Sequence, residues 1–159
     1  MAADTRGAST QADNEGRTRR DPWLWTGGIL ILDSSAVVAM LVEEEGYRQL
    51  AEAMEGAEVV GIGAPTLVET DMVMTGRFDL GGRGLVAQFL EENQVIVVPF
   101  DSEHRNVAVE AFVRYGKGRG PAALNYGDCM TYATARVADH PLLFTGKDFA
   151  QTDLVPALS

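Results

Sequence analysis

From residue 29 onward, short apolar runs alternate with stretches in which apolar residues recur every three or four positions. Short runs bounded by polar residues predict buried β-strands, whereas the wider spacing predicts amphipathic helices. The pattern predicts strands at residues 29–32, 58–62, 95–98 and 142–144. It predicts helices at residues 34–44, 47–54, 65–75, 103–115 and 125–138, and a further helix that includes residues 85–90.

Local signals support several of these boundaries. Ser34 or Ser35 is expected to cap the first helix, because a serine hydroxyl accepts a hydrogen bond from the amides of the first turn. Pro65 suits the first turn of the third helix, where its missing amide has no partner to lose. Residues 116–121 alternate glycine with basic residues and end in proline, which predicts a loop.

Short apolar strands separated by helices predict a parallel sheet covered on both faces. We therefore expect a three-layer α/β/α sandwich with a central parallel sheet of four to five strands. The length of 159 residues suits one domain. Residues 1–20 contain almost no large apolar side chain, so residues 1–28 are expected to be a disordered or weakly ordered extension of a domain at 29–159.

The apolar stretch from Trp23 to Val42 follows two arginines, which raises the alternatives of an export signal or a membrane span. Asp33 interrupts it, at a cost of about 2.5 to 3.5 kcal/mol in a membrane, and the uninterrupted part at 29–32 is too short to span. A single cysteine, Cys129, excludes an intrachain disulfide and fits a reducing compartment. We expect a cytoplasmic protein without a membrane segment, and export is the minor alternative.

The formal net charge is −10, from 23 acidic and 13 basic residues. This balance opposes a simple basic nucleic-acid binder. Residues 1–28 hold four acids and four bases, so the remaining residues carry the whole excess. Most of these acids fall on polar helix faces, where a solvated surface is the ordinary interpretation.

Four acids fall at the ends of elements instead. Asp33 follows the first strand, Glu69 lies in the helix after the second, Asp128 opens the helix after the glycine-rich loop, and Asp148 follows the fourth strand. The carboxyl ends of parallel strands share one edge of a sheet, and ligands bind there. We expect these four acids to converge, with Asp153 as a possible fifth member.

Carboxylates that lie close together repel one another, and a divalent cation removes that repulsion. A set of acids without histidine or cysteine favours Mg²⁺ or Mn²⁺ over Zn²⁺. A carboxylate-held Mg²⁺ is a common device for hydrolysing phosphodiesters. Each acid alone has an ordinary alternative, since Asp33 can cap a helix, Asp128 can serve a helix dipole and Asp148 can form an Asx turn.

Four segments resemble one known family, in order and over residues 29–156. They are Ile31-Leu32-Asp33-Ser34-Ser35-Ala36, Pro65-Thr66-Leu67-Val68-Glu69, Asn125-Tyr126-Gly127-Asp128-Cys129, and Leu143-Phe144-Thr145-Gly146-Lys147-Asp148-Phe149 with Thr152-Asp153-Leu154 behind. The series resembles a PIN-domain ribonuclease, and within that superfamily the VapC toxins of bacterial toxin–antitoxin pairs.

The resemblance implies a Mg²⁺-dependent endoribonuclease, with Mn²⁺ as a possible substitute and a metal-activated water as nucleophile. The implied metal-binding catalytic acids are Asp33, Glu69, Asp128 and Asp148. Thr145 and Ser34 are implied to be supporting hydroxyls, and Asp153 an auxiliary acid. The implied partners are an RNA substrate, a second copy of the chain and a cognate antitoxin that lies across the acidic site, with no DNA binding by the toxin alone.

Arg114, Lys117 and Arg119 are the candidates for contacting RNA phosphates, and a merely solubilising loop is the alternative. Cys129 lies beside an expected metal ligand but has no base near it in sequence, so helix packing is the better interpretation. Trp23 and Trp25 are interpreted as a hydrophobic anchor for the extension rather than as a platform for stacking bases.

Two rival functions are retained. A divalent-metal phosphatase also has an acid after its first strand, but Ser35 occupies the position of its usual second aspartate. A PIN-like binding module that has lost its activity is the other rival, and the complete set of four acids opposes it.

Overall fold

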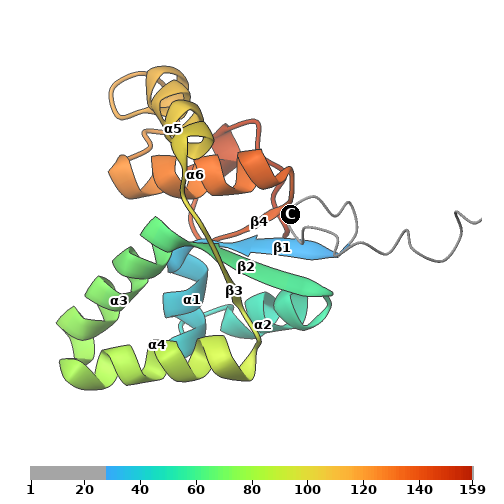
Figure 1. The fold of residues 1–159 in the computed structure, drawn as a ribbon, viewed down its shortest axis with the longest axis vertical. Coiled ribbons are helices and arrows are strands. Elements are labelled where there is room, and N and C mark those ends of the chain that lie inside the picture. The colour runs from blue at the N-terminus through green and yellow to red at the C-terminus, as the bar shows by residue number, and fades with distance from the viewer. Residues whose placement is uncertain (1–27, 159) are drawn as a thin grey trace, which may run out of the picture.

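A computed structural model describes residues 28–158 of the chain. The expected extension at residues 1–28 lies outside the described residues except for Gly28. The elements, in chain order, are β1 (Ile29–Leu32), α1 (Ser34–Leu41), α2 (Tyr47–Glu55), β2 (Val59–Gly63), α3 (Ala64–Phe78), α4 (Leu80–Glu92), β3 (Ile96–Val98), α5 (Ser102–Tyr115), α6 (Tyr126–Ala138), β4 (Leu142–Leu143) and the short 3₁₀ helix η2 (Phe149–Gln151) (Figure 1).

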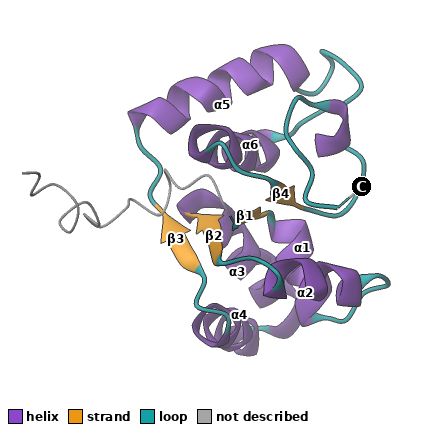
Figure 2. Cartoon of the chain, turned by 90° about the vertical axis from the view of Figure 1, so that its right-hand side faces the viewer, coloured by secondary structure: helices purple, strands orange, loops and turns teal. Residues whose placement is uncertain are grey.

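The four strands form one parallel sheet in the order β3-β2-β1-β4, as the alternation of strands and helices predicts. Side chains alternate along β1, so Ile29 and Ile31 join the core beneath α5 and α6, while Leu30 and Leu32 join the core beneath α1, α2 and α4. Figure 2 shows the sheet between these two helical layers. The three-layer α/β/α sandwich is therefore confirmed.

The N-cap of α1 is the alternative that the sequence left open for Asp33, not the serine cap. Asp33, rather than Ser34 or Ser35, is the N-cap, because its side chain accepts a hydrogen bond from the amide of Ser35. The helix also ends at Leu41 rather than near residue 44. Glu43 has a positive φ of 53°, which no residue of an α-helix adopts, and this ends the apolar helix before the run of glutamates.

Helix α3 is longer than predicted, and it packs against α4, which contains the predicted residues 85–90, as a hairpin (Figure 1). The helix predicted at 85–90 begins at Leu80, because glycines near its start weaken the apolar pattern. One of them, Gly82, is required by packing, since a Cβ there would lie 2.1 Å from the carbonyl oxygen of Met74. Strand β4 is also shorter than predicted and excludes Phe144.

No helix within residues 28–158 is long and apolar enough to cross a membrane.

Candidate active site at the carboxyl edge of the sheet

Asp33 is the first residue after β1 and is almost fully buried, with 4% of its surface exposed. Its amide donates to the carbonyl of Leu143 on β4 (2.9 Å), which fixes the backbone at the end of the sheet. One carboxylate oxygen, Oδ2, accepts hydrogen bonds from the amide (3.0 Å) and the hydroxyl (2.5 Å) of Ser35. The carboxylate is thus held in one orientation while it caps α1.

Ser35 links the two strand ends that carry acids. Besides donating to Asp33, its Oγ accepts a hydrogen bond from the amide of Thr145 (3.0 Å), in the segment that leads from β4 to Asp148. This role for Ser35 was not predicted from the sequence. Thr145 contributes through its amide, and its side chain is exposed.

Glu69 reaches the same region from α3. The hydroxyl of Ser34 donates to Glu69 Oε2 (3.0 Å), which leaves Oε1 without a hydrogen bond among the described residues. Ser34 is therefore in contact with one of the four acids, as a supporting hydroxyl would be.

Helices α3 and α6 are held together one turn away from this point. The hydroxyls of Thr66 and Thr131, both almost fully buried, share a hydrogen bond of 2.8 Å. Glu69 lies three residues after Thr66, and Asp128 lies three residues before Thr131, so one helical turn separates the threonine pair from each acid. The threonine pair therefore sets how closely the two acids approach.

Asp128 lies in the first turn of α6 within a reciprocal capping box. Its amide donates to the side chain of Asn125 (2.9 Å), and its Oδ2 accepts from the amide of Asn125 (2.8 Å). Gly127 beside it has no side chain, and a Cβ there would lie 2.6 Å from Glu69 Oε1. Neither Asn125 nor Gly127 was assigned a role from the sequence, although both belong to the motif around Asp128.

The electrostatics show that the four acids share one region. Burial raises the pKa of Asp128, the hydrogen bond from Asn125 offsets part of that rise, and the negative charges of Asp33, Asp148 and Glu69 raise it further. Asp148 itself is exposed, at the start of η2. The charges of the other three acids therefore act on Asp128, although the four residues are far apart in sequence.

The donor set suits a hard divalent cation, since it consists of carboxylates that repel one another. As their side chains lie, however, no three acidic, histidine or cysteine residues among the described ones are close enough together to hold a metal ion. The oxygens bound by Ser34, Ser35 and Asn125 are turned toward their hydrogen-bond donors. The residues fit Mg²⁺ in chemistry and number, and their carboxylates have to close inward to bind it.

Asp153 lies in a separate network. Its Oδ1 accepts from the hydroxyl of Tyr132 (2.6 Å), and its Oδ2 lies 3.4 Å from Arg114 Nη1. Partial burial alone would raise the pKa of Asp153, but the Tyr132 hydrogen bond and the charges of Arg114 and Arg136 outweigh it and lower the pKa. The structure therefore gives Asp153 a contact with α5 and α6 and none with the other four acids.

Two of the three candidate RNA-binding residues are engaged with other side chains. Arg114 pairs with Asp153, and its guanidinium lies over the ring of Tyr115, 4.8 Å from the centroid. Arg119 lies over the ring of Phe112, at 5.1 Å. Lys117 is exposed in the loop before α6, whose backbone is tied to the end of α5 by hydrogen bonds such as Leu124 N to Tyr115 O (2.8 Å).

Comparison with known proteins identifies the class. The sequence matches the PIN domain over residues 30–154, which is most of the chain. The chain therefore belongs to the PIN-domain family.

Relatives within this family are ribonucleases. The chain is 45% identical to Ribonuclease VapC36 of Mycobacterium tuberculosis over 126 residues, which cover 79% of this chain and 91% of that protein. It is 40% identical to Ribonuclease VapC of Mycolicibacterium smegmatis over 126 residues, which cover 79% and 97%. These identities make the chain a member of the VapC group of PIN-domain ribonucleases.

Solved structures agree on the fold. The chain is similar to the crystal structure of Mycobacterium tuberculosis VapC20, described as a sarcin-ricin loop cleaving toxin (TM-score 0.65, 17% identity, 79% of this chain and 96% of that chain). It is also similar to VapBC2 from Rickettsia felis, solved on a DNA fragment from its promoter (TM-score 0.64, 13% identity, 80% and 96%).

Proposed function

We propose that the protein is a divalent-metal-dependent endoribonuclease that acts as the toxin of a toxin–antitoxin pair. The observation that carries this proposal is that Asp33, Glu69, Asp128 and Asp148 lie in one region at the carboxyl edge of the sheet. Hydrogen bonds of Ser34 and Ser35 tie the elements of this region together, and burial, followed by the charges of the other three acids, raises the pKa of Asp128. Membership of the VapC group supports the choice of RNA as substrate.

Asp33, Glu69, Asp128 and Asp148 would hold Mg²⁺, or Mn²⁺ in its place. The ion supplies an activated water and positive charge to offset the charge of the phosphodiester. The chain's own contribution is preorganisation: Ser35 orients Asp33, Ser34 orients Glu69, and the capping box orients Asp128. Rigid placement matters because misplacing a catalytic group by 1 Å can cost about 10²-fold in rate.

RNA binding by a chain of net charge −10 needs local positive charge. Lys117 is the best-placed candidate, because it is exposed and makes no side-chain ion pair with another described residue. Arg119 is exposed as well, and a guanidinium that lies over a ring can still present its edge to a phosphate. Arg114 is a weaker candidate, since its charge is already paired with Asp153.

The proposed partners are a second copy of the chain and a cognate antitoxin. Large apolar side chains are exposed on the helices that carry or neighbour the acids, including Val68 and Met72 on α3, Val109 and Phe112 on α5, and Tyr126 on α6. Exposed apolar patches of this kind mark interaction sites. A structure similar to this one is a toxin–antitoxin complex from Klebsiella pneumoniae (TM-score 0.60, 18% identity, 78% of this chain and 92% of that chain).

The rival functions are less well supported. In a phosphatase, a second aspartate would occupy the position of Ser35, whereas here this serine holds Asp33 and the segment after β4. An inactive binding module has no need for four carboxylates held at mutual repulsion, and all four are present.

The test is incubation of the purified protein with total RNA and Mg²⁺, with EDTA and with an Asp33→Asn variant as parallel reactions. We expect discrete RNA fragments with Mg²⁺, none with EDTA, and none with the variant. Glu91→Gln, which changes an exposed acid on α4, is the matched control and should cut like the parent. Cleavage by Asp33→Asn at the parental rate would overturn the site, and intact RNA under all metals would favour the inactive module.

A further inference from the structure

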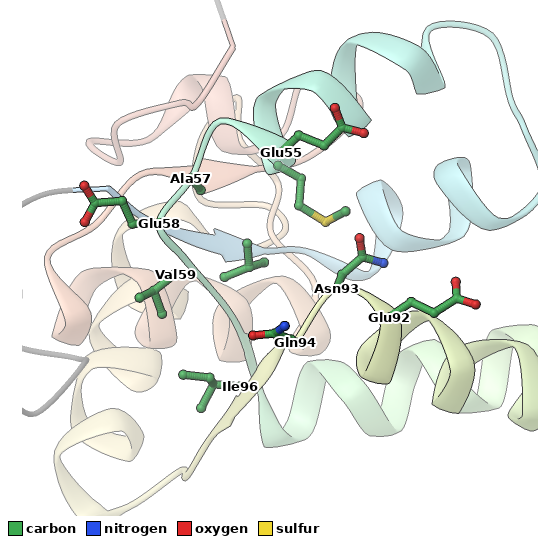
Figure 3. Close-up of a pocket in the computed structure, with 10 residues that line it drawn as sticks. Glu55, Ala57, Glu58, Val59, Glu92, Asn93, Gln94 and Ile96 are labelled. Atoms are coloured by element: carbon green, nitrogen blue, oxygen red, sulfur yellow. The ribbon is translucent and has the colours of Figure 1, made fainter.

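A groove lies at the amino edge of the sheet, opposite the edge that carries the four acids. Its volume is about 310 Å³, and it lies where β2 and β3 begin and where α2 and α4 end. Apolar side chains of Met54, Val59 and Ile96 contribute to its lining. Glu55, Glu58 and Glu92 also line it, and their carboxylates extend outward at its margin (Figure 3). We call this feature the basal groove.

The charges around the basal groove are negative. The C-termini of α2 and α4 both end there, and each adds the negative end of a helix dipole. Neither helix has a basic residue in its last turn to offset this, and the last helical residues are Glu55 and Glu92 themselves. Among the ion pairs of the described residues, none involves Glu55, Glu58 or Glu92. The groove therefore suits an occupant that is both cationic and apolar.

The chain enters the sheet beside this groove. The carbonyl of Gly28 accepts hydrogen bonds from the amides of Glu58 (2.7 Å) and Val59 (3.1 Å), two residues of the lining. Gly28 has a φ of +77°, and a Cβ there would lie 2.7 Å from Glu58 Cγ. Gly28 is thus in close contact with Glu58 at the edge of the basal groove, so the segment that precedes Gly28 begins beside the groove.

The preceding segment has the composition that the groove requires. Residues 17–25 read Arg-Thr-Arg-Arg-Asp-Pro-Trp-Leu-Trp, with three arginines and two tryptophans. Trp25 lies three residues before Gly28, a reach of about 10 Å for extended chain, and Trp23 falls on the same face of an extended segment as Trp25. Arginine and tryptophan are the residue types that dominate tight docking contacts.

We propose that residues 17–25 of this chain dock in the basal groove, with the indoles against Met54, Val59 and Ile96 and the arginines beside Glu55, Glu58 and Glu92. The match to the PIN domain begins at residue 30, so this contact is additional to the family fold. It lies at the opposite edge of the sheet from Asp33 and Asp148, so it fastens the segment without covering the acidic site.

Tryptophan fluorescence tests this directly, because Trp23 and Trp25 are the only tryptophans in the chain. The full-length protein is measured at rising salt and with acrylamide as a soluble quencher. We expect emission at shorter wavelength than in the denatured chain and weaker quenching by acrylamide. Both differences should shrink with salt, because the arginine contacts are solvent-exposed ion pairs.

Charge reversal locates the contact. Glu58→Lys with Glu92→Lys should shift emission to longer wavelength and increase quenching, whereas Glu110→Lys, an exposed acid on α5, should change neither. Adding Arg19→Glu and Arg20→Glu to the first pair should restore the parental emission. Circular dichroism confirms that each variant is folded.

Three results would overturn the proposal. The first is tryptophan emission of the folded protein equal to that of the denatured chain. The second is protection from acrylamide that the Glu58→Lys, Glu92→Lys variant retains, and the third is protection that disappears on dilution, which would indicate a second copy as the partner. The readout does not depend on RNA cleavage, so it can fail or succeed independently of the proposed ribonuclease activity.

Discussion

Replacing Gly127 with alanine should abolish most of the activity while leaving the fold intact. Gly127 lies in the first turn of α6, directly before Asp128. A Cβ at this position would lie 2.6 Å from Glu69 Oε1 and 3.0 Å from Glu69 Cδ, whereas ordinary contacts begin at 3.4 Å. The carboxylate of Glu69 therefore has to retreat by about 0.8 Å.

The expected changes in stability and in cleavage rate follow from the fact that the Glu69 side chain is the group that moves. The end of a glutamate side chain can rotate away, so the clash itself costs little stability, and alanine stabilises a helix relative to glycine by up to about 1 kcal/mol. The melting temperature should therefore stay equal or rise by no more than about 4 °C. A displacement approaching 1 Å in a catalytic group predicts a loss of about 10²-fold in the rate of RNA cleavage.

The assay compares RNA cleavage rate and thermal unfolding in the parent, Gly127→Ala and Gly76→Ala. Gly76 is the matched control, because nothing lies within 4 Å of the position its Cβ would take. Combining Gly127→Ala with Glu69→Asp, which shortens the acid by about 1.5 Å, should recover part of the lost rate. Full activity in Gly127→Ala would refute the idea that the close approach of Glu69 to α6 is required.

Three further predictions concern the contacts around the site. Thr66→Val should lower the free energy of unfolding by about 1–3 kcal/mol, because it leaves the buried hydroxyl of Thr131 unpaired. In denaturant titration, the double Thr66→Val, Thr131→Val variant should lose less of this free energy than the single variant. Burial and the hydrogen bond to Asp153 raise the pKa of Tyr132, so in ultraviolet pH titration its phenol should ionise after an ordinary tyrosine, and Asp153→Asn should lower that pKa. The raised pKa of Asp128 means that the folded, metal-free protein binds the proton of this carboxyl more tightly than the unfolded chain does. The free energy of unfolding in EDTA should therefore fall as pH rises through that pKa, and Asp128→Asn should reduce the fall.

The architecture could be predicted from the sequence because its strands are fully apolar. The run Ile-Leu-Ile-Leu of β1 is buried on both faces, so it reads as a continuous apolar block and is located to the residue. The start of α4 was harder to predict, because its glycines interrupt the apolar pattern. Gly82 is needed there for α4 to approach Met74, and this packing between two helices is not visible in the local sequence.

The proximity of the four acids could be expected from the sequence because chain topology brings the ends of their elements to one edge of the sheet, and their role as metal ligands stays a prediction. Asp33 and Asp148 follow adjacent parallel strands, and Glu69 and Asp128 open onto the same edge. The resemblance implied supporting hydroxyls at Ser34 and Thr145, but the role of Ser35 could not be predicted, because its contact with Thr145 joins residues 110 positions apart. The network of Asp153 with Tyr132 and Arg114 was hidden for the same reason, since it depends on the relative placement of three elements.

The central claim is that these four carboxylates bind one divalent-metal centre, and anomalous diffraction from crystals grown with Mn²⁺ tests it most directly. The account predicts a manganese peak bounded by Asp33, Glu69, Asp128 and Asp148, with carboxylate oxygens at about 2.0–2.5 Å, and its loss in crystals of Asp128→Asn. A protein that cuts RNA while manganese binds elsewhere, or while these four carboxylates stay apart around water, would contradict it.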